Sequence, residues 1–242
     1  MRFLPAGDTA LTVEFGSTIS DDSLARVRRL DAALAAHAPD GVQEVVPTYR
    51  SLQIVYDPTV IGWQALEQAV QAVLEGPDKG AEARPARLWT VPVAYGGAHG
   101  IDLEPAAARL GLTPQALARA HAACDFTVAM IGFQPGFAYL AGLPEALHLS
   151  RQDSPRRETP AGSISIGGVQ AAISSVAAPS AWHLLGRTPL RPFDLRRDPP
   201  FLFRSGDRVR FRPIDAAEFD VIAARVAAGD PGATPEEAPH AD

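Results

Sequence analysis

A stretch without hydrophobic periodicity, residues 76–85 (GPDKGAEARP), separates two halves of the chain that carry different apolar patterns. Its proline, glycine and charged residues are typical of an interdomain linker. We therefore expect one domain over residues 1–80 and a second over residues 86–228. Residues 229–242 are rich in proline, glycine and acidic side chains, and this composition predicts a disordered tail.

The N-terminal half alternates between strand and helix patterns. Apolar residues at every second position over 10–15 predict a half-buried strand. Residues 21–36 carry leucine and valine at helical spacing behind a Ser-Asp-Asp start, which predicts an amphipathic helix. Two strands and a second helix are expected at 42–46, 52–56 and 63–75. This β-α-β-β-α order lacks one strand of a ferredoxin-like sandwich, and residues 88–93 either supply it or begin the second domain.

The C-terminal half consists mainly of short apolar runs separated by glycine and proline. Such punctuation predicts many short strands, and hence a β-barrel or a sandwich. The strands are expected at 126–131, 163–166, 169–174, 201–203 and 208–212. Helices are expected at 103–110, 113–122 and 215–228.

Charge and rare residues exclude several classes of function. The net charge of −6 argues against a general nucleic-acid binder, which needs a basic face. Lys79 is the only lysine and no G-x-x-x-x-G-K-[ST] sequence occurs, so we expect neither a P-loop nor a lysine-linked cofactor. Cys124 is the only cysteine, and no paired-cysteine or H-E-x-x-H spacing indicates a metal site. Without a signal-peptide pattern or a run of about 20 apolar residues, a soluble cytoplasmic protein is expected.

Three loop segments carry residue types suited to ligand binding. Residues 132–140 combine glycine and proline with three aromatic side chains, which either line a small ligand or plug the core. Residues 155–168 place two arginines before a glycine-rich stretch. That pattern suits either the binding of a carboxylate or phosphate, or a solvated arginine pair. Residues 182–189 contain a single arginine among apolar neighbours.

Two further groupings leave alternatives open. Arg187, if partly buried, needs a carboxylate, which comes either from a ligand or from Asp194 or Asp207. His121 and Cys124 lie three residues apart at the end of a predicted helix, a spacing that places two side chains on one face. A catalytic Cys–His pair requires a third group to orient the imidazole, so a structural histidine is the simpler interpretation.

Several motifs occur in one order along the chain. The C-terminal half contains 132–144 (GFQPGFAYLAGLP), 160–168 (PAGSISIGG), Gln170, 184–189 (LLGRTP) and 193–194 (FD). Nearer the N-terminus lie 7–11 (GDTAL), 44–52 (EVVPTYRSL), 56–58 (YDP), 92–97 (PVAYGG) and 102–103 (DL). Over residues 7–214 the chain thereby resembles the subunit 1 family of allophanate hydrolase. That family includes the B subunit of 5-oxoprolinase and a bacterial inhibitor of a sporulation histidine kinase.

The resemblance implies an α+β chain with a ferredoxin-like N-terminal domain followed by a cyclophilin-like β-barrel domain. It implies the B subunit of an ATP-dependent 5-oxoprolinase-type amidohydrolase, which cleaves 5-oxoproline to glutamate together with a homologous cyclophilin-like subunit and a lactam-binding subunit. ATP with Mg would then serve the complex, no cofactor would be bound covalently by this chain, and the isolated chain would be inactive. The alternatives are a regulatory module that inhibits a sensor histidine kinase and a component of a biotin-linked urea or allophanate carboxyltransferase system.

The same resemblance suggests which residues contact a ligand. Arginine side chains are assigned to anion contact, and backbone beside glycine is assigned to the ligand-facing surface. These candidates are Arg156 and Arg187 for the anion, Pro135, Gly136, Gly162 and Ser163 for the backbone, and Gln170 within its motif. No catalytic or metal-ligating residue is assigned.

One segment departs from the family pattern. The family usually reads Thr-Gly-Ile-Tyr-Pro and then Ser-Pro-Gly-Gly between Gln170 and Trp182. Here residues 171–175 read AAISS and residues 178–181 read APSA. A tyrosine, which is a ligand donor, and three glycines are thus missing, so the pattern leaves the substrate open.

Overall fold

The computed structural model describes residues 1–76 and 87–237. The chain divides into two compact units, Met1–Pro85 and Ala86–Asp242, and each unit has a hydrophobic core of its own. Except for Gly76, the predicted linker lies outside the described residues. Among the described residues, no helix is long and apolar enough to cross a membrane.

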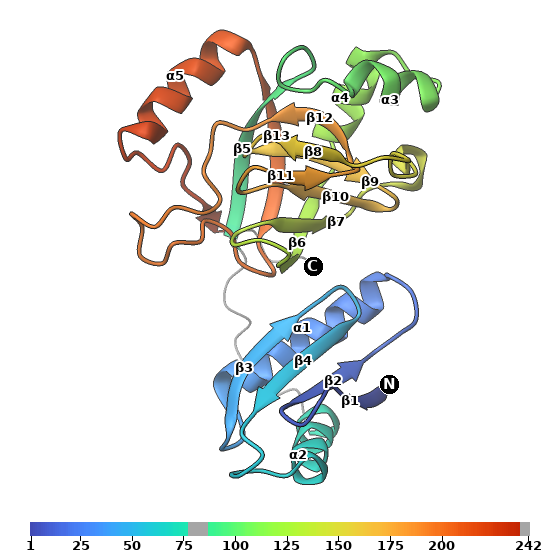
Figure 1. The fold of residues 1–242 in the computed structure, drawn as a ribbon, viewed down its shortest axis with the longest axis vertical. Coiled ribbons are helices and arrows are strands. Elements are labelled where there is room, and N and C mark those ends of the chain that lie inside the picture. The colour runs from blue at the N-terminus through green and yellow to red at the C-terminus, as the bar shows by residue number, and fades with distance from the viewer. Residues whose placement is uncertain (77–86, 238–242) are drawn as a thin grey trace. The chain divides into compact units, whose positions relative to one another are not determined.

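The first unit is a four-stranded antiparallel sheet with two helices against one face (Figure 1). Its elements are β1 (Arg2–Pro5), β2 (Ala10–Glu14), α1 (Asp21–Ala36), β3 (Val42–Pro47), β4 (Ser51–Tyr56) and α2 (Trp63–Glu75). The first helix begins as predicted, because the Ser20 side chain accepts a hydrogen bond from the Ser23 N–H and two acidic residues follow in the first turn. Val27 and Leu30 of this helix then pack on Leu52 and Ile54 of the sheet.

The strand order β1-β2-β4-β3 resolves the alternative left by the sequence. β1 pairs antiparallel with β2 at the sheet edge, and so takes the position of the fourth strand in a ferredoxin-like sheet. Residues 88–93 instead lie in the first strand of the second unit.

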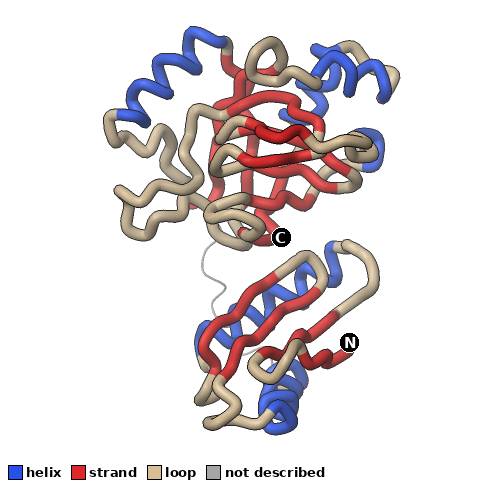
Figure 2. The backbone as a smooth tube through the Cα atoms, viewed as in Figure 1, coloured by secondary structure: helices blue, strands red, loops and turns tan. Residues whose placement is uncertain are grey.

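The second unit is built mainly from strands, with helices at its periphery (Figure 2). Its strands are β5 (Arg87–Tyr95), β6 (Phe126–Ile131), β7 (Ala138–Ala141), β8 (Arg156–Thr159), β9 (Ser163–Gly167), β10 (Gln170–Ile173), β11 (Ala178–Ser180), β12 (His183–Arg187), β13 (Arg208–Ile214) and β14 (Glu236–Glu237). Its helices are α3 (Leu103–Arg109), α4 (Pro114–Ala122), the short 3-10 helix η1 (Glu145–Leu147) and α5 (Ala216–Ala227).

The strands of the second unit close into a barrel. Within the described residues the order is β12-β9-β10-β7-β6-β13-β5, and a further pairing of β12 with β5 completes the ring. β5 and β13 run parallel, whereas the other neighbours in the ring are antiparallel. The prediction of an α+β chain with a ferredoxin-like unit and a cyclophilin-like barrel is confirmed.

Two local predictions differ from the structure. Residues 201–203 form no strand, and only a single bridge joins Phe201 to Phe193. Residues 229–237 belong to the predicted tail, yet β14 pairs with β5, and Gly232 packs against Leu190. Backbone pairing therefore orders this segment despite its polar composition, and residues 238–242 lie outside the described residues.

Candidate functional site

A cavity of about 290 Å³ lies between the outer surface of the barrel and a two-stranded ribbon formed by β8 and β11. In the view of Figure 1 the ribbon lies in front of the barrel strands. The volume is at the lower end of the ~300–1,000 Å³ that is usual for small-molecule sites. The lining residues are Phe133, Gln134, Phe137, Tyr139, Arg151, Pro155, Thr159, Ser163, Ser165, Ser174, Ala178, Pro179, Ser180, Ala181, Trp182 and Leu184.

The alternation of β9 produces the floor of this cavity. Successive strand residues point to opposite faces, and Ile164 and Ile166 accordingly lie in the hydrophobic core while Ser163 and Ser165 line the cavity. Trp182 packs directly on Gly167, because a Cβ placed there would lie 2.7 Å from the indole Cγ. The glycine after the Ser-Ile-Ser-Ile sequence therefore allows the indole to form one wall.

Four aromatic rings form a continuous wall of the cavity. The centroid of the Phe137 ring lies 4.7 Å from that of Tyr139 and 5.7 Å from that of Phe133. The Tyr139 and Trp182 centroids are 6.0 Å apart in an edge-to-face arrangement. Phe133 is 70% exposed and has a φ of 65°, which is strained for a large side chain. A flat apolar ring of a ligand would find matching surfaces here.

Hydroxyl groups supply the polar contacts of the cavity. The Ser163 hydroxyl donates to the Pro160 carbonyl at 2.7 Å, and the Thr159 hydroxyl donates to the Ala178 carbonyl at 2.9 Å. Their oxygens keep a free acceptor lone pair. The Ser165 hydroxyl makes no hydrogen bond to the described residues, so both its donor and its acceptor are available to a ligand.

The charge of the lining is positive. Arg151 is its only basic residue, and the lining contains no aspartate or glutamate among the described residues. Burial raises the pKa of Tyr139, and the nearby positive charge of Arg151 opposes that rise. Within residues 1–76 and 87–237, no group of three or more His, Cys, Asp or Glu side chains is placed to hold a metal ion.

The predicted backbone candidates lie in three different settings. Ser163 lines the cavity. Pro135 and Gly136 line a second, shallow hollow of about 340 Å³ beside Phe201. Gly162 is buried in the barrel wall, where its N–H donates to the Ser174 carbonyl at 3.0 Å.

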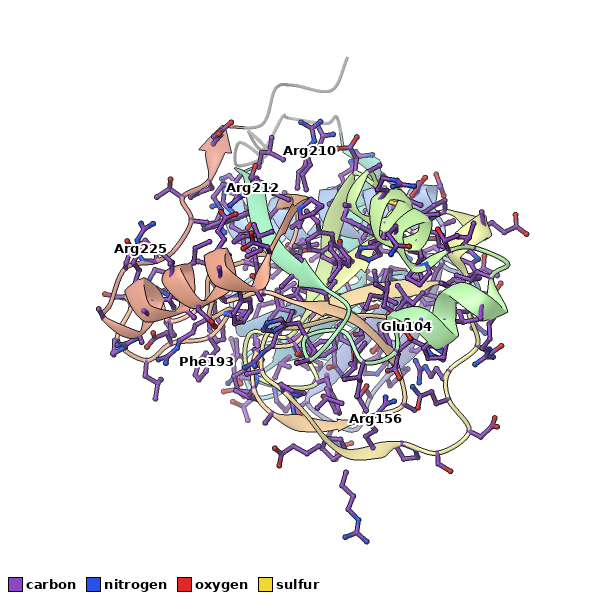
Figure 3. All side chains as sticks on the ribbon, turned by 90° about the horizontal axis from the view of Figure 1, so that it is seen from above. Glu104, Arg156, Phe193, Arg210, Arg212 and Arg225 are labelled. Atoms are coloured by element: carbon purple, nitrogen blue, oxygen red, sulfur yellow. The ribbon has the colours of Figure 1, made fainter. Side chains whose placement is uncertain are left out.

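The predicted anion-binding arginines lie outside the cavity lining. Arg156 pairs with the buried Asp102, whose other oxygen accepts the Leu184 N–H at 2.8 Å. Figure 3 shows Arg156 on the same side of the barrel unit as Glu104 in α3, the helix that Asp102 precedes. Arg156 is thus paired with an acid of its own chain and is not part of the cavity lining.

Arg187 has neither of the carboxylate partners that the sequence offered. Its Nε donates to the Ala161 carbonyl at 2.8 Å, and its guanidinium lies 5.8 Å from the centroid of Phe219. Asp207 pairs with Arg87, and Asp194 pairs with an arginine two residues later. Gln170, at the start of β10, also lies outside the lining.

His121 of α4 and Cys124, which lies two residues beyond the end of that helix, do not form a pair. The Cys124 thiol donates to the Ala120 carbonyl at 3.2 Å, whereas His121 Nδ1 meets the Tyr95 hydroxyl at 2.9 Å. His121 is fully buried and stacks on Phe211 at 5.1 Å between ring centroids. Burial lowers the pKa of His121 to about 3, so the ring is neutral and structural.

Sequence reasoning missed Arg151, Ser165 and the role of the β8–β11 ribbon. Arg151 lies in a polar stretch without periodicity, so no local pattern distinguishes it. The alternating serine and isoleucine residues of 163–166 did carry a signal, because they predict a strand with one polar face. The aromatic residues of 132–140 do line a cavity, as one of the two interpretations held.

Comparisons with known proteins agree with this architecture. Residues 1–203 match the family described as carboxyltransferase domain, subdomain C and D. The B subunit of 5-oxoprolinase from Escherichia coli O157:H7 is 38% identical over 208 residues, which cover 86% of this chain and 93% of the relative. The B subunit of 5-oxoprolinase from Bacillus subtilis (strain 168) is 32% identical over 223 residues, which cover 88% of this chain and 92% of that relative. The crystal structure of TTHA0988 matches at a TM-score of 0.75 and 33% identity over 86% of this chain, which spans 40% of that longer protein.

Proposed function

The chain belongs to the family of the carboxyltransferase domain, subdomain C and D, and on that basis we propose that it is the B subunit of an ATP-dependent 5-oxoprolinase-type amidohydrolase complex. Its partners are a homologous cyclophilin-like subunit and a lactam-binding subunit. ATP with Mg is used by the assembled complex, and 5-oxoproline is converted to glutamate.

The observation that carries this proposal is the chemistry of the cavity. A lactam presents a small flat ring, one carbonyl acceptor and one N–H donor. The aromatic wall around Tyr139 and Trp182 suits the ring, and the free hydroxyl of Ser165 suits the amide. The oxygen of Ser163 adds an acceptor for the amide N–H. A volume of about 290 Å³ suits a ligand of this small size.

The reaction has to overcome the low reactivity of an amide. The γ-phosphoryl group of ATP passes to the lactam oxygen, and ADP leaves. One water adds at the activated carbon, the ring C–N bond breaks with its electron pair on nitrogen, and a second water releases phosphate. 5-Oxoproline, ATP and two water molecules thus give glutamate, ADP and phosphate.

In this reaction the chain binds the lactam and does not carry out the proton transfers. Arg151 and Tyr139 are the only side chains of the described cavity lining that ionise, and neither is a base at neutral pH. The described cavity lining offers no general base, and we place the general base and the remaining phosphate-holding groups in the other subunits. The isolated chain is accordingly inactive, and it becomes part of an enzyme only in the complex.

Reconstitution tests the proposal. ADP and glutamate are measured with Mg-ATP and 5-oxoproline for the chain alone, for its partner subunits alone and for the mixture. Turnover is expected only in the mixture, and Ser165→Val in this chain should lower kcat/KM about tenfold. Ser154→Val, at an exposed position outside the lining, is the matched control. Turnover by the isolated chain, or an inactive but assembled mixture, contradicts the proposal.

A further inference from the structure

Arg151 is a cation at the cavity whose N–H donors are unused. It is exposed, and its guanidinium carbon lies 5.3 Å from the centroid of the Trp182 ring. Within residues 1–76 and 87–237, it forms neither an ion pair nor a side-chain hydrogen bond. By contrast, Arg156, Arg196 and Arg210 each contact a carboxylate. An arginine that is held by an indole but has no acid keeps its fork of donors for another partner.

The backbone on both sides of Arg151 is fixed to the barrel. His183 donates from Nε2 to the Ser150 carbonyl at 2.8 Å, and the Gln152 N–H donates to the Ala181 carbonyl at 2.8 Å. His183 is itself buried. Two hydrogen bonds within three residues therefore hold the arginine at one place on the cavity rim, and less ordering is needed when a ligand binds.

The charge pattern around Arg151 favours an anion. No aspartate or glutamate of the described residues lines the cavity, so a carboxylate entering it meets no like charge. Burial raises the pKa of the Tyr139 hydroxyl, and the positive charge of Arg151 at the same cavity opposes that rise. A guanidinium can stack on an aromatic face and still offer a carboxylate its planar fork of donors.

We infer that Arg151 selects the substrate by binding its carboxylate, while the aromatic wall holds the ring. This inference rests on the proposed function, since it assigns a contact to the lactam placed in the same cavity. It limits the substrate class to cyclic amides with a carboxylate next to the ring nitrogen. Arg151 is a specificity residue, and it takes no part in bond breaking.

The test compares two ligands that differ only in charge, 5-oxoproline and its neutral carboxamide, 5-oxoprolinamide. Affinities for the full chain are measured by calorimetry or by ligand-observed NMR. The unsubstituted chain should bind the acid about tenfold more tightly than the amide, and the preference should fall as salt increases. Arg151→Gln should abolish the preference without weakening amide binding. Arg157→Gln, an exposed arginine outside the lining, should keep it.

The outcomes separate this inference from the proposed function. Equal affinities for acid and amide in the unsubstituted chain, a preference that survives Arg151→Gln, or no binding of either compound would overturn the inference. A reconstituted complex that hydrolyses 5-oxoproline without that preference keeps the function and removes the role of Arg151. A chain that discriminates through Arg151 in a complex without turnover keeps the role and removes the reaction. Melting temperatures of both variants confirm that each is folded.

Discussion

Replacement of Gly162 by alanine should destabilise the barrel, because this glycine lies where three strands approach one another. Its N–H donates to the Ser174 carbonyl at 3.0 Å, and its carbonyl accepts the Thr188 N–H at 2.9 Å. Its φ is +80°, and a Cβ would lie 2.4 Å from the Thr188 carbonyl oxygen. The sequence assigned Gly162 to a ligand, whereas these contacts assign it to closure of the barrel between β9 and β12.

The magnitude follows from two separable costs. A left-handed backbone costs a residue with a Cβ about 1–2 kcal/mol. Ordinary contact begins at 3.4 Å, so Thr188 must also move away by about 1 Å. This movement weakens the hydrogen bond from the Thr188 N–H to the Gly162 carbonyl, which is worth about 1 kcal/mol. The free energy of unfolding should therefore fall by about 2–3 kcal/mol for Gly162→Ala. Gly168→Ala is the matched control, since Gly168 has a φ of +66° but nothing within 4 Å of the new Cβ. This substitution should cost only the roughly 1–2 kcal/mol of the left-handed backbone.

Thermal unfolding of the two variants measures the difference. For a unit of this size, Gly162→Ala should lower the melting temperature by roughly 4–12 °C, and Gly168→Ala should lower it clearly less. Equal destabilisation by the two substitutions would refute the overlap argument. If Gly162→Ala melts like the control but loses 5-oxoproline binding, the ligand-facing assignment made from the sequence is right instead.

Two further predictions concern Arg187 and His121. Arg187→Ala removes one hydrogen bond to Ala161 and one ring contact with Phe219, so unfolding free energy should fall by about 1–2 kcal/mol. A loss above about 3 kcal/mol, or a change in 5-oxoproline affinity beyond about twofold, contradicts this. Since burial lowers the pKa of His121 from 6.5 to about 3, the unfolded chain takes up a proton that the folded chain refuses. As the pH falls below about 6.5, the free energy of unfolding should therefore decrease by about 1.4 kcal/mol per pH unit more in the unsubstituted chain than in His121→Gln. The same loss of stability in both proteins between about pH 7 and pH 5 would count against this prediction.

The helices were predictable from the sequence because their signals are local. Ser20 and Thr113 each cap a helix by accepting a backbone N–H three residues later, as the sequence indicated. Apolar spacing then fixed the faces that are buried. The strands β8 and β11 were not predictable, since each is short and, within the described residues, each pairs with the other alone. Their partners Thr159 and Ala178 are 19 residues apart in the sequence.

Two ion pairs of the barrel unit could not be predicted, because their partners lie far apart in the chain. Arg156 meets Asp102 across 54 residues, and Arg87 meets Asp207 across 120. Nothing in the local sequence distinguishes these arginines from Arg151, which is left without an acid among the described residues. The sequence assigned anion contact to Arg156 and Arg187, and the structure places neither of them in the lining of this cavity.

The residues between 171 and 181 that depart from the family pattern lie in two different environments. Ala171 and Ile173 are in the hydrophobic core of the barrel, so this part of the segment keeps the apolar character that the strand needs. Ser174 and residues 178–181 line the cavity. The missing tyrosine and two of the missing glycines thus change the surface that a ligand meets, whereas the third missing glycine corresponds to the buried Ala172, outside the lining. Because the cavity lies outside the core, selection for a different ligand can act on these positions at little cost to folding. The carboxylate test at Arg151 probes the same surface, since the residue after Arg151 is hydrogen-bonded to Ala181.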